Sequence, residues 1–182
     1  MKAKAGGFTL IEMAVAMGIL MTAVLGGLLM ILMGVTRNNT NRVDTTATNV
    51  AQAVIEQISG APTNANPVLT MTDCLQTTPA TSTLKVNTAP GGATLQGNGD
   101  IDFNANDPVT LNGQQYQMNF TVCADNTPQS TQTVYDVRWN IQAVGAGGWG
   151  KLVTVSARQP FVATQKGIGF IRPVTLRTIV SM

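Results

Sequence analysis

The stretch Gly6-Gly7-Phe8-Thr9-Leu10-Ile11-Glu12 lies close to the start of the chain and opens an apolar run that ends at Val35. Glu12 is the only ionisable residue in that run. A carboxylate buried in lipid costs a few kcal/mol, so it usually has a function and a partner of opposite charge. The basic residues Lys2 and Lys4 precede the run. The N-terminus therefore indicates a short basic segment followed by a membrane helix with a built-in charge.

The apolar run is long enough to cross a membrane. As a helix, residues 8–35 would extend about 42 Å, which exceeds the ~30 Å hydrocarbon core of a bilayer. A conventional secretory signal has a shorter apolar core followed by a small-residue cleavage site such as Ala-x-Ala, and no Ala-x-Ala directly follows this run. Charge counting leaves the orientation open, because Lys2 and Lys4 lie on one side and Arg37 and Arg42 on the other.

These residues resemble the N-terminus of type IV prepilins and of the related pseudopilins of type II secretion. That family has a short basic leader ending in Gly, then Phe, a Thr or Ser, Leu-Ile-Glu and a long apolar helix. Here the leader is residues 1–7, Gly7 is its last residue, and Phe8 to Glu12 form the FTLIE block. The resemblance covers about the first 35 residues. It implies a pilin-like α+β fold, in which a long N-terminal helix packs on an antiparallel β-sheet head.

The resemblance also implies a processing step and an assembly role. A prepilin peptidase would cut after Gly7 and N-methylate the new amino group of Phe8. Glu12 matches the glutamate that is thought to neutralise the amine of a neighbouring subunit during assembly. Because Glu12 follows Phe8 by four positions, the two lie on one helix face, and an intramolecular pair that aids insertion is an alternative that does not exclude assembly. The implied partners are the peptidase/methylase, other pilin subunits, the inner-membrane assembly platform and the membrane.

The expected function is that of a non-enzymatic minor pilin, incorporated into a type IV pilus or priming its assembly. Major pilins usually carry a proline in the apolar helix, and this chain has none there; its Gly-Gly-Leu-Leu pattern, residues 26–29, is most like PilV-type minor pilins. The precursor would cross the inner membrane once, with its head in the periplasm, and the assembled subunit would lie in the pilus at the cell surface. Two alternatives stay open: a type II secretion pseudopilin, and a membrane-anchored adhesin-like module that binds through Trp149 and Thr-rich loops.

Beyond residues 8–35, the helix is predicted to continue over residues 36–60 as an amphipathic segment. Its apolar residues recur at intervals of three and four, and Gly60-Ala61-Pro62 is predicted to end it. We expect this apolar face to pack against the head, residues 61–182. The residues of the face are Val43, Ala47, Val50, Ala51, Val54, Ile55 and Ile58.

The head is predicted to be an antiparallel meander of three or four strands. Residues 63–99 are rich in Thr, Pro, Asn and Gly and are predicted to be mostly loop, with a short strand over Thr83–Asn87. Asn112-Gly113 is typical of a two-residue hairpin turn between residues 109–111 and 114–116. Alternating residues predict further strands over 117–124, 134–144 and 152–157, and Trp139 is expected in the core. The stretch 167–174 is predicted as an edge strand, because Pro173 argues against a central one.

Cys74 and Cys123 both follow the membrane segment. In an oxidising compartment an even number of cysteines favours a disulfide, and two buried free thiols are the alternative. A bridge that closes about 50 residues would stabilise the fold by roughly 4 kcal/mol on the chain-entropy model.

The remaining candidates for chemistry are weak. The chain has no histidine and a net charge of +2, which becomes zero without Lys2 and Lys4, so we expect no catalytic site, no cofactor and no nucleic-acid partner. The acidic stretch Asp100–Asp107 lacks the Gly and Glu that a calcium loop needs, so no metal site is predicted. Three basic residues of the strands, Arg138, Lys151 and Arg158, are expected to form a solvated face.

Overall fold

A computed structural model describes most of the chain, namely Gly7 and residues 9–62, 66–80, 82–105, 110–111, 114–125, 127–145, 150–160 and 172–181. Within these residues it contains one long helix and a set of antiparallel strands, which confirms the expected α+β class. The contacts divide the chain into two units, Met1–Arg42 and Val43–Met182.

Helix α1 runs without interruption from Leu10 to Ser59 and supplies residues to both units. In the first unit, all of its side chains as far as Arg42 are exposed. The helix ends where the sequence predicts, since the N–H of Gly60 still donates to the carbonyl of Glu56 at 2.9 Å and Pro62 follows. A proline cannot continue the helical hydrogen-bond ladder, so it makes a sharp stop.

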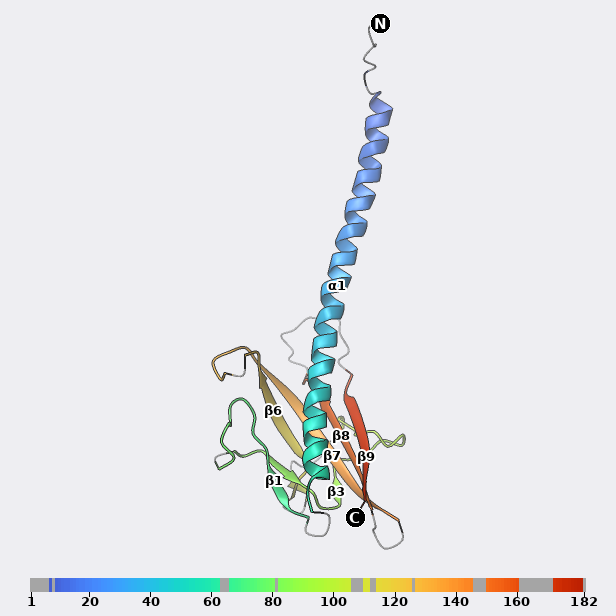
Figure 1. Ribbon diagram of the computed structural model, residues 1–182. Coiled ribbons are helices and arrows are strands. Elements are labelled where there is room, and N and C mark those ends of the chain that lie inside the picture. The colour runs from blue at the N-terminus through green and yellow to red at the C-terminus, as the bar shows by residue number, and fades with distance from the viewer. Residues whose placement is uncertain are drawn as a thin grey trace. The chain divides into compact units, whose positions relative to one another are not determined.

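The second unit is built on a five-stranded antiparallel sheet. Four strands form an antiparallel meander: β6 (Gln117–Cys123), β7 (Gln132–Val144), β8 (Gly150–Arg158) and β9 (Val174–Ser181), of which β6, β7 and β8 lie at the predicted positions. Strand β3 (Gly91–Gly92) pairs with β7 beyond the end of β6. In Figure 1, β7 and β8 therefore occupy the centre of the sheet, with β6 and β9 on opposite sides.

The core lies between one face of this sheet and the Val43–Ser59 part of α1. The predicted alternation in β7 is confirmed, and Trp139 is fully buried, with its Nε1–H donating to the carbonyl of Asn87 at 3.0 Å. The helix contributes five buried residues of the predicted stripe, and Val43 and Ile55 pack at its margin. The buried residues are Ala47, Val50, Ala51, Val54 and Ile58 from the helix and Tyr135, Val137, Trp139, Ile141, Val153, Val155 and Ala157 from the sheet.

Two short pairs of strands complete the unit. Strand β1 (Val68–Thr70) pairs with β2 (Lys85–Asn87), which lies within the predicted strand over residues 83–87. Strand β4 (Thr110–Leu111) pairs with β5 (Gln114–Gln115), and this register confirms the predicted hairpin. Its turn residues, Asn112 and Gly113, lie outside the described residues.

Two strands that the sequence does not predict, β1 and β3, lie in the segment 63–99, which is predicted to be mostly loop apart from the strand over Thr83–Asn87. Strand β1 is only three residues long, and β3 consists of two glycines that carry no side-chain pattern. Gly92 has a φ of 137°, and a Cβ atom there would lie 2.4 Å from the carbonyl oxygen of Trp139. The pairing of β3 with β7 therefore depends on the missing side chain, which a search for alternating apolar residues cannot detect.

The predicted C-terminal strand is displaced along the chain. The expected edge strand over 167–174 is wrong at its C-terminal end, because Pro173 precedes the strand and β9 begins at Val174. Residues 167–171 lie outside the described residues. Proline has no N–H to donate to a ladder, and it is tolerated at the start of a strand.

Candidate functional site

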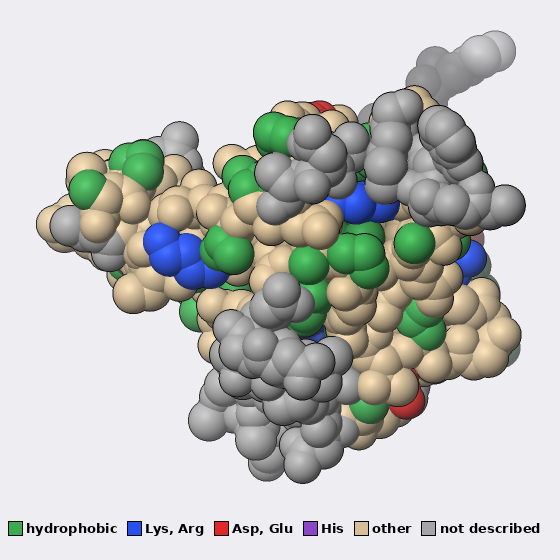
Figure 2. All heavy atoms as spheres, turned by 90° about the horizontal axis from the view of Figure 1, so that it is seen from below, with side chains coloured by type: hydrophobic (Ala, Val, Ile, Leu, Met, Phe, Trp, Pro, Cys, Tyr) green, Lys and Arg blue, Asp and Glu red, His purple; other side chains and the backbone are tan. Residues whose placement is uncertain are grey.

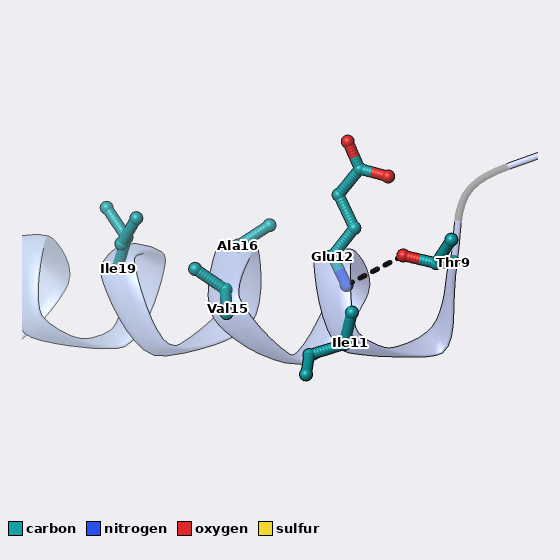
Figure 3. A pocket seen from close by; sticks show the side chains of 6 residues that line it. All are labelled: Thr9, Ile11, Glu12, Val15, Ala16 and Ile19. Carbon is teal, nitrogen blue, oxygen red and sulfur yellow. Dashed lines mark hydrogen bonds between the residues drawn. The ribbon is translucent and has the colours of Figure 1, made fainter.

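The first turn of α1 is closed by Thr9. The Thr9 hydroxyl accepts a hydrogen bond from the N–H of Glu12 at 3.3 Å, and the Thr9 carbonyl accepts from the N–H groups of Glu12 and Met13 (Figure 3). Thr9 is therefore the N-cap residue of the helix and Glu12 its third helical residue. The sequence contains this signal, because Thr-x-x-Glu ahead of an apolar run is a capping-box pattern, but the prepilin resemblance alone does not single out Thr9.

The carboxylate of Glu12 has no hydrogen-bond or ion-pair partner among the described residues. Figure 3 shows its side chain extending away from the helix and clear of the Thr9 hydroxyl, beside a shallow hollow lined by Val15, Ala16 and Ile19. A negative charge in the first turn gains only about 0.3–1 kcal/mol from the helix dipole. The same charge at the centre of a membrane helix costs about 2.5–3.5 kcal/mol or more. Helix capping therefore does not account for a carboxylate in this apolar segment.

The surface around Glu12 is apolar along more than six turns of helix. Every side chain from Leu10 to Val35 is exposed, Leu10 by 89% and Met30 by 78%. The helix is long and apolar enough to cross a membrane. Among the described residues of the second unit, by contrast, the large exposed apolar side chains are few: Val68, Leu75, Val134, Val144 and Ile179. The face seen in Figure 2 accordingly shows apolar side chains in small separate groups.

The predicted processing site is only partly described. Gly7 is exposed, and a Cβ atom there would meet nothing within 4 Å among the described residues. The described residues therefore give no steric reason for a glycine at this position. Phe8, the predicted site of cleavage and N-methylation, lies outside the described residues, so its distance from Glu12 stays a prediction.

The predicted disulfide is present. Cys74 and Cys123 are joined, with their Cα atoms 5.9 Å apart. The neighbouring Asp73 is buried, and its carboxylate accepts hydrogen bonds from the N–H groups of Leu75, Gln76 and Thr121. The disulfide and Asp73 together hold the segment after β1 against strand β6.

The solvated basic face predicted from Arg138, Lys151 and Arg158 is wrong. Arg138 and Lys151 are buried, and Arg158 is only partly exposed. Arg138 and Arg158 both pair with Asp136, at 3.2 and 3.5 Å, and both stack on the ring of Phe103. Their side chains also donate to the carbonyls of Ala105 and Phe103, so they hold the segment 93–105 on the sheet face opposite α1.

Lys151 lies on the other face of the sheet, the face toward α1. Its ammonium donates to the side-chain oxygen of Asn66 at 2.6 Å and to the carbonyl of Thr88 at 3.1 Å. Both acceptors are neutral, and burial lowers the pKa of the Lys151 ammonium. Lys151 is therefore a structural link between β8 and the segment that carries β1 and β2.

The other sequence candidates do not form a site among the described residues. Asp100 pairs with Arg177 at 2.9 Å, and Asp102 accepts from the N–H of Asn104 in a local turn. The described residues contain no group of three His, Cys, Asp or Glu side chains placed to hold a metal ion. Trp149, the candidate contact residue of an adhesin-like module, lies outside the described residues.

Comparison with protein-family models, with curated proteins and with solved structures gave no match to this chain.

Proposed function

We propose that this chain is a type IV prepilin that becomes a minor subunit of a pilus. A prepilin peptidase cuts it after Gly7 and methylates Phe8, and the apolar part of α1 anchors the precursor in the inner membrane. The same part of the helix then packs beside the helices of other pilin subunits in the fibre. The observation that carries the proposal is a carboxylate with no partner among the described residues, in the first turn of an apolar helix that leaves every side chain from Leu10 to Val35 exposed.

This arrangement has two requirements: apolar surroundings for the helix and a positive partner for the carboxylate. An exposed apolar helix of this length requires lipid or other apolar helices around it. A charged carboxylate in that surrounding requires a positive partner, and the amine created by cleavage at Phe8 is a group of the right sign. A neighbouring subunit would supply that amine in the fibre.

Two further observations support processing and a minor role. The fold does not require glycine at position 7, so a need for a small residue there is explained by a protease that acts next to it. Helix α1 is continuous from Leu10 to Ser59 and has no proline, whereas a proline is usual in the apolar helix of major pilins.

Mass spectrometry of the mature N-terminus tests the processing step. The wild-type protein should begin with a methylated Phe8, and a Gly7→Val variant should keep Met1, because the larger side chain obstructs the peptidase. Gly6→Val is the matched control and should be cut normally. An intact Met1 in the wild-type protein would contradict the proposal.

A second experiment tests the role of Glu12. A Glu12→Gln variant should enter the membrane normally but appear in sheared fibres at a level lower by at least about tenfold, which corresponds to 1.4 kcal/mol. Glu56→Gln is the control, since Glu56 lies on the same helix outside the apolar segment. Wild-type protein that stays with the cells after shearing would favour the anchored adhesin-like module instead. If the protein works only with a secretin-based exporter and enters no fibre, that result would favour the type II secretion pseudopilin.

A further inference from the structure

The two cysteines of this chain differ in how easily they can be reached. Cys123 is the last residue of β6 and is only 4% exposed, whereas Cys74 lies in the segment 71–77 after β1 and is partly exposed. A hollow of about 310 Å³ lies beside the two cysteines and is also lined by Phe120 and Thr77. A molecule that approaches this hollow from solvent therefore has readier access to Cys74 than to Cys123.

The segment 71–77 is docked on β6 by contacts other than the disulfide. One oxygen of the Asp73 carboxylate accepts hydrogen bonds from the N–H groups two and three residues further on, at 3.0 and 2.7 Å, and so closes a turn within the segment. The other oxygen accepts from the N–H of Thr121 in β6 at 3.1 Å. Thr121 lies two residues before Cys123, so one carboxylate joins the turn that carries Cys74 to the end of the strand that carries Cys123.

The start of the segment is anchored as well. Met71 is buried in the core, and its N–H donates to the carbonyl of Leu84 at 3.0 Å. Asp73 is also buried, and an N–H group left without an acceptor at such a site is costly. None of these contacts involves a sulfur atom, so they can form while both cysteines are still thiols. They bring the Cα atoms of Cys74 and Cys123 to the 5.9 Å that suits a bridge.

The chemistry of disulfide formation gives this difference in access a consequence. A thiolate attacks the disulfide of an oxidant, and the reaction passes through a mixed disulfide between the protein and the oxidant. The rate of the first attack depends on the access of the attacking thiol. With the segment docked, the two cysteines are therefore suited to different steps.

We propose that Cys74 is the residue that a thiol–disulfide oxidoreductase oxidises first, and that Asp73 is a positioning residue that presents Cys74 to Cys123 for the second step. In the first step the Cys74 thiolate forms a bond to one sulfur of the oxidant's disulfide, and the other sulfur leaves as a thiolate. In the second step the Cys123 thiolate attacks the Sγ of Cys74 and releases the remaining sulfur of the oxidant. The chain loses two electrons and two protons, and the oxidant's disulfide is reduced to a dithiol. The new bond then makes the docking of the segment 71–77 permanent.

Chains with a single cysteine test the order of the two steps. The full-length protein in detergent is treated with oxidised glutathione, and the mixed disulfide is measured by mass. Cys74 of a Cys123→Ala chain should react at least about tenfold faster than Cys123 of a Cys74→Ala chain, and the two rates should become similar in denaturing urea. Equal rates in the folded chains, or a faster reaction of Cys123, would overturn the proposal.

The wild-type chain tests the same order without a substitution. Its disulfide is reduced, the reductant is removed, and reoxidation by oxidised glutathione is stopped with acid at early times. Peptide mass spectrometry should then find glutathione on Cys74 and not on Cys123. Glutathione mainly on Cys123 would overturn the proposal, whatever the single-cysteine chains show.

The role of Asp73 is tested by Asp73→Asn, which keeps the size of the side chain but removes a carboxylate oxygen from the N–H of Thr121. The mixed disulfide at Cys74 should form at the wild-type rate but close to the Cys74–Cys123 bond at least about tenfold more slowly. Asp102→Asn is the matched control, since Asp102 accepts its hydrogen bond within a local turn, and it should close at the wild-type rate.

Two results with Asp73→Asn would overturn the positioning role. One is closure at the wild-type rate. The other is slow closure together with a lost tryptophan fluorescence signal, which would show a general effect on folding. None of these measurements depends on incorporation into a fibre, so the inference and the proposed function can fail separately.

Discussion

At the scale of single residues, Asp136 joins strands β7 and β8 through its charge pairs. Its carboxylate is the counter-charge for Arg138 and Arg158, and it also accepts from the side chain of Gln117. Removal of one member of a buried ion pair leaves an uncompensated charge, which costs more than the pair contributes. The Asp100–Arg177 pair of the same unit is exposed by more than 40% at both side chains and offers a direct comparison.

We expect Asp136→Asn to lower the free energy of unfolding by about 3 kcal/mol, because Arg138 would keep its buried charge without a carboxylate to balance it. Asp100→Asn should lower it by less than about 1 kcal/mol, since exposed pairs contribute little. Urea unfolding of the full chain in detergent, followed by tryptophan fluorescence, measures both. Equal losses in the two variants would contradict the role of Asp136.

The sequence reveals some of these residues and conceals others. Glu12 stands out because a lone carboxylate in an apolar run is rare, and Cys74 and Cys123 stand out because they are the chain's two cysteines. The role of Asp136 depends on its position opposite Arg158 in the register of β7 and β8. No local pattern in one strand specifies which residue of the next strand lies opposite, so Arg138 and Arg158 are predicted to be solvated and are instead paired.

At the scale of elements, the sequence predicts those that carry a side-chain period. The apolar stripe of α1 and the alternation of β6, β7 and β8 give elements close to the predicted ones. Strand β3 escapes prediction because its pairing depends on two glycines. Strand β9 lies further along the chain than predicted, because it begins only after Pro173. Sequence patterns therefore locate the elements that pack by side chains and miss those that pair by backbone alone.

Strand β3 gives a sharp test of this distinction. Gly92→Ala should destabilise the fold by about 3 kcal/mol or more, because the added Cβ meets backbone atoms of Trp139 and Asn140 at 2.4 and 2.5 Å. Gly97→Ala is the control, since no atom lies within 4 Å of its added Cβ, and it should change stability by less than about 0.5 kcal/mol. Thermal unfolding of the two variants distinguishes them, and a stable Gly92→Ala protein would show that β3 is dispensable.

The disulfide should contribute substantially, because it closes a loop with a sequence separation of 49 residues. Its loss in a Cys74→Ala/Cys123→Ala variant should lower the free energy of unfolding by about 4 kcal/mol. Urea unfolding with and without a reducing agent provides the measurement. The double variant should not respond to the reductant, and a response there would mean that the reductant acts elsewhere.

At the scale of the whole molecule, two buried titratable groups have opposite effects on folding stability in alkaline solution. Burial lowers the pKa of Lys151 below 10.5 and raises the pKa of Tyr116 above 10.0. Between the lowered pKa of Lys151 and its ordinary value, the unfolded chain binds more protons, so stability rises with pH. Above the ordinary pKa of tyrosine, the folded chain keeps the Tyr116 proton longer, so stability falls with pH.

We therefore expect a maximum of stability on the alkaline side, close to the point where tyrosine begins to ionise. Urea midpoints measured from about pH 8 to about pH 11 should show a rise followed by a fall. Lys151→Met should remove the rise, and Tyr116→Phe should reduce the fall. A wild-type curve that declines throughout this range would contradict the burial of Lys151.

The β6 edge of the sheet, where the Asp73 carboxylate accepts the N–H of Thr121, has a consequence for producing the protein in a foreign host. Asp73 reaches Thr121 from a segment that the Cys74–Cys123 bond holds in place, so in a reducing compartment that support is lost. A chain made in a reducing cytosol then presents an open β6 edge, and edge-to-edge association can start there. Soluble yield should accordingly follow the thiol-oxidising capacity of the expression host, and export to an oxidising compartment is the route to monodisperse material.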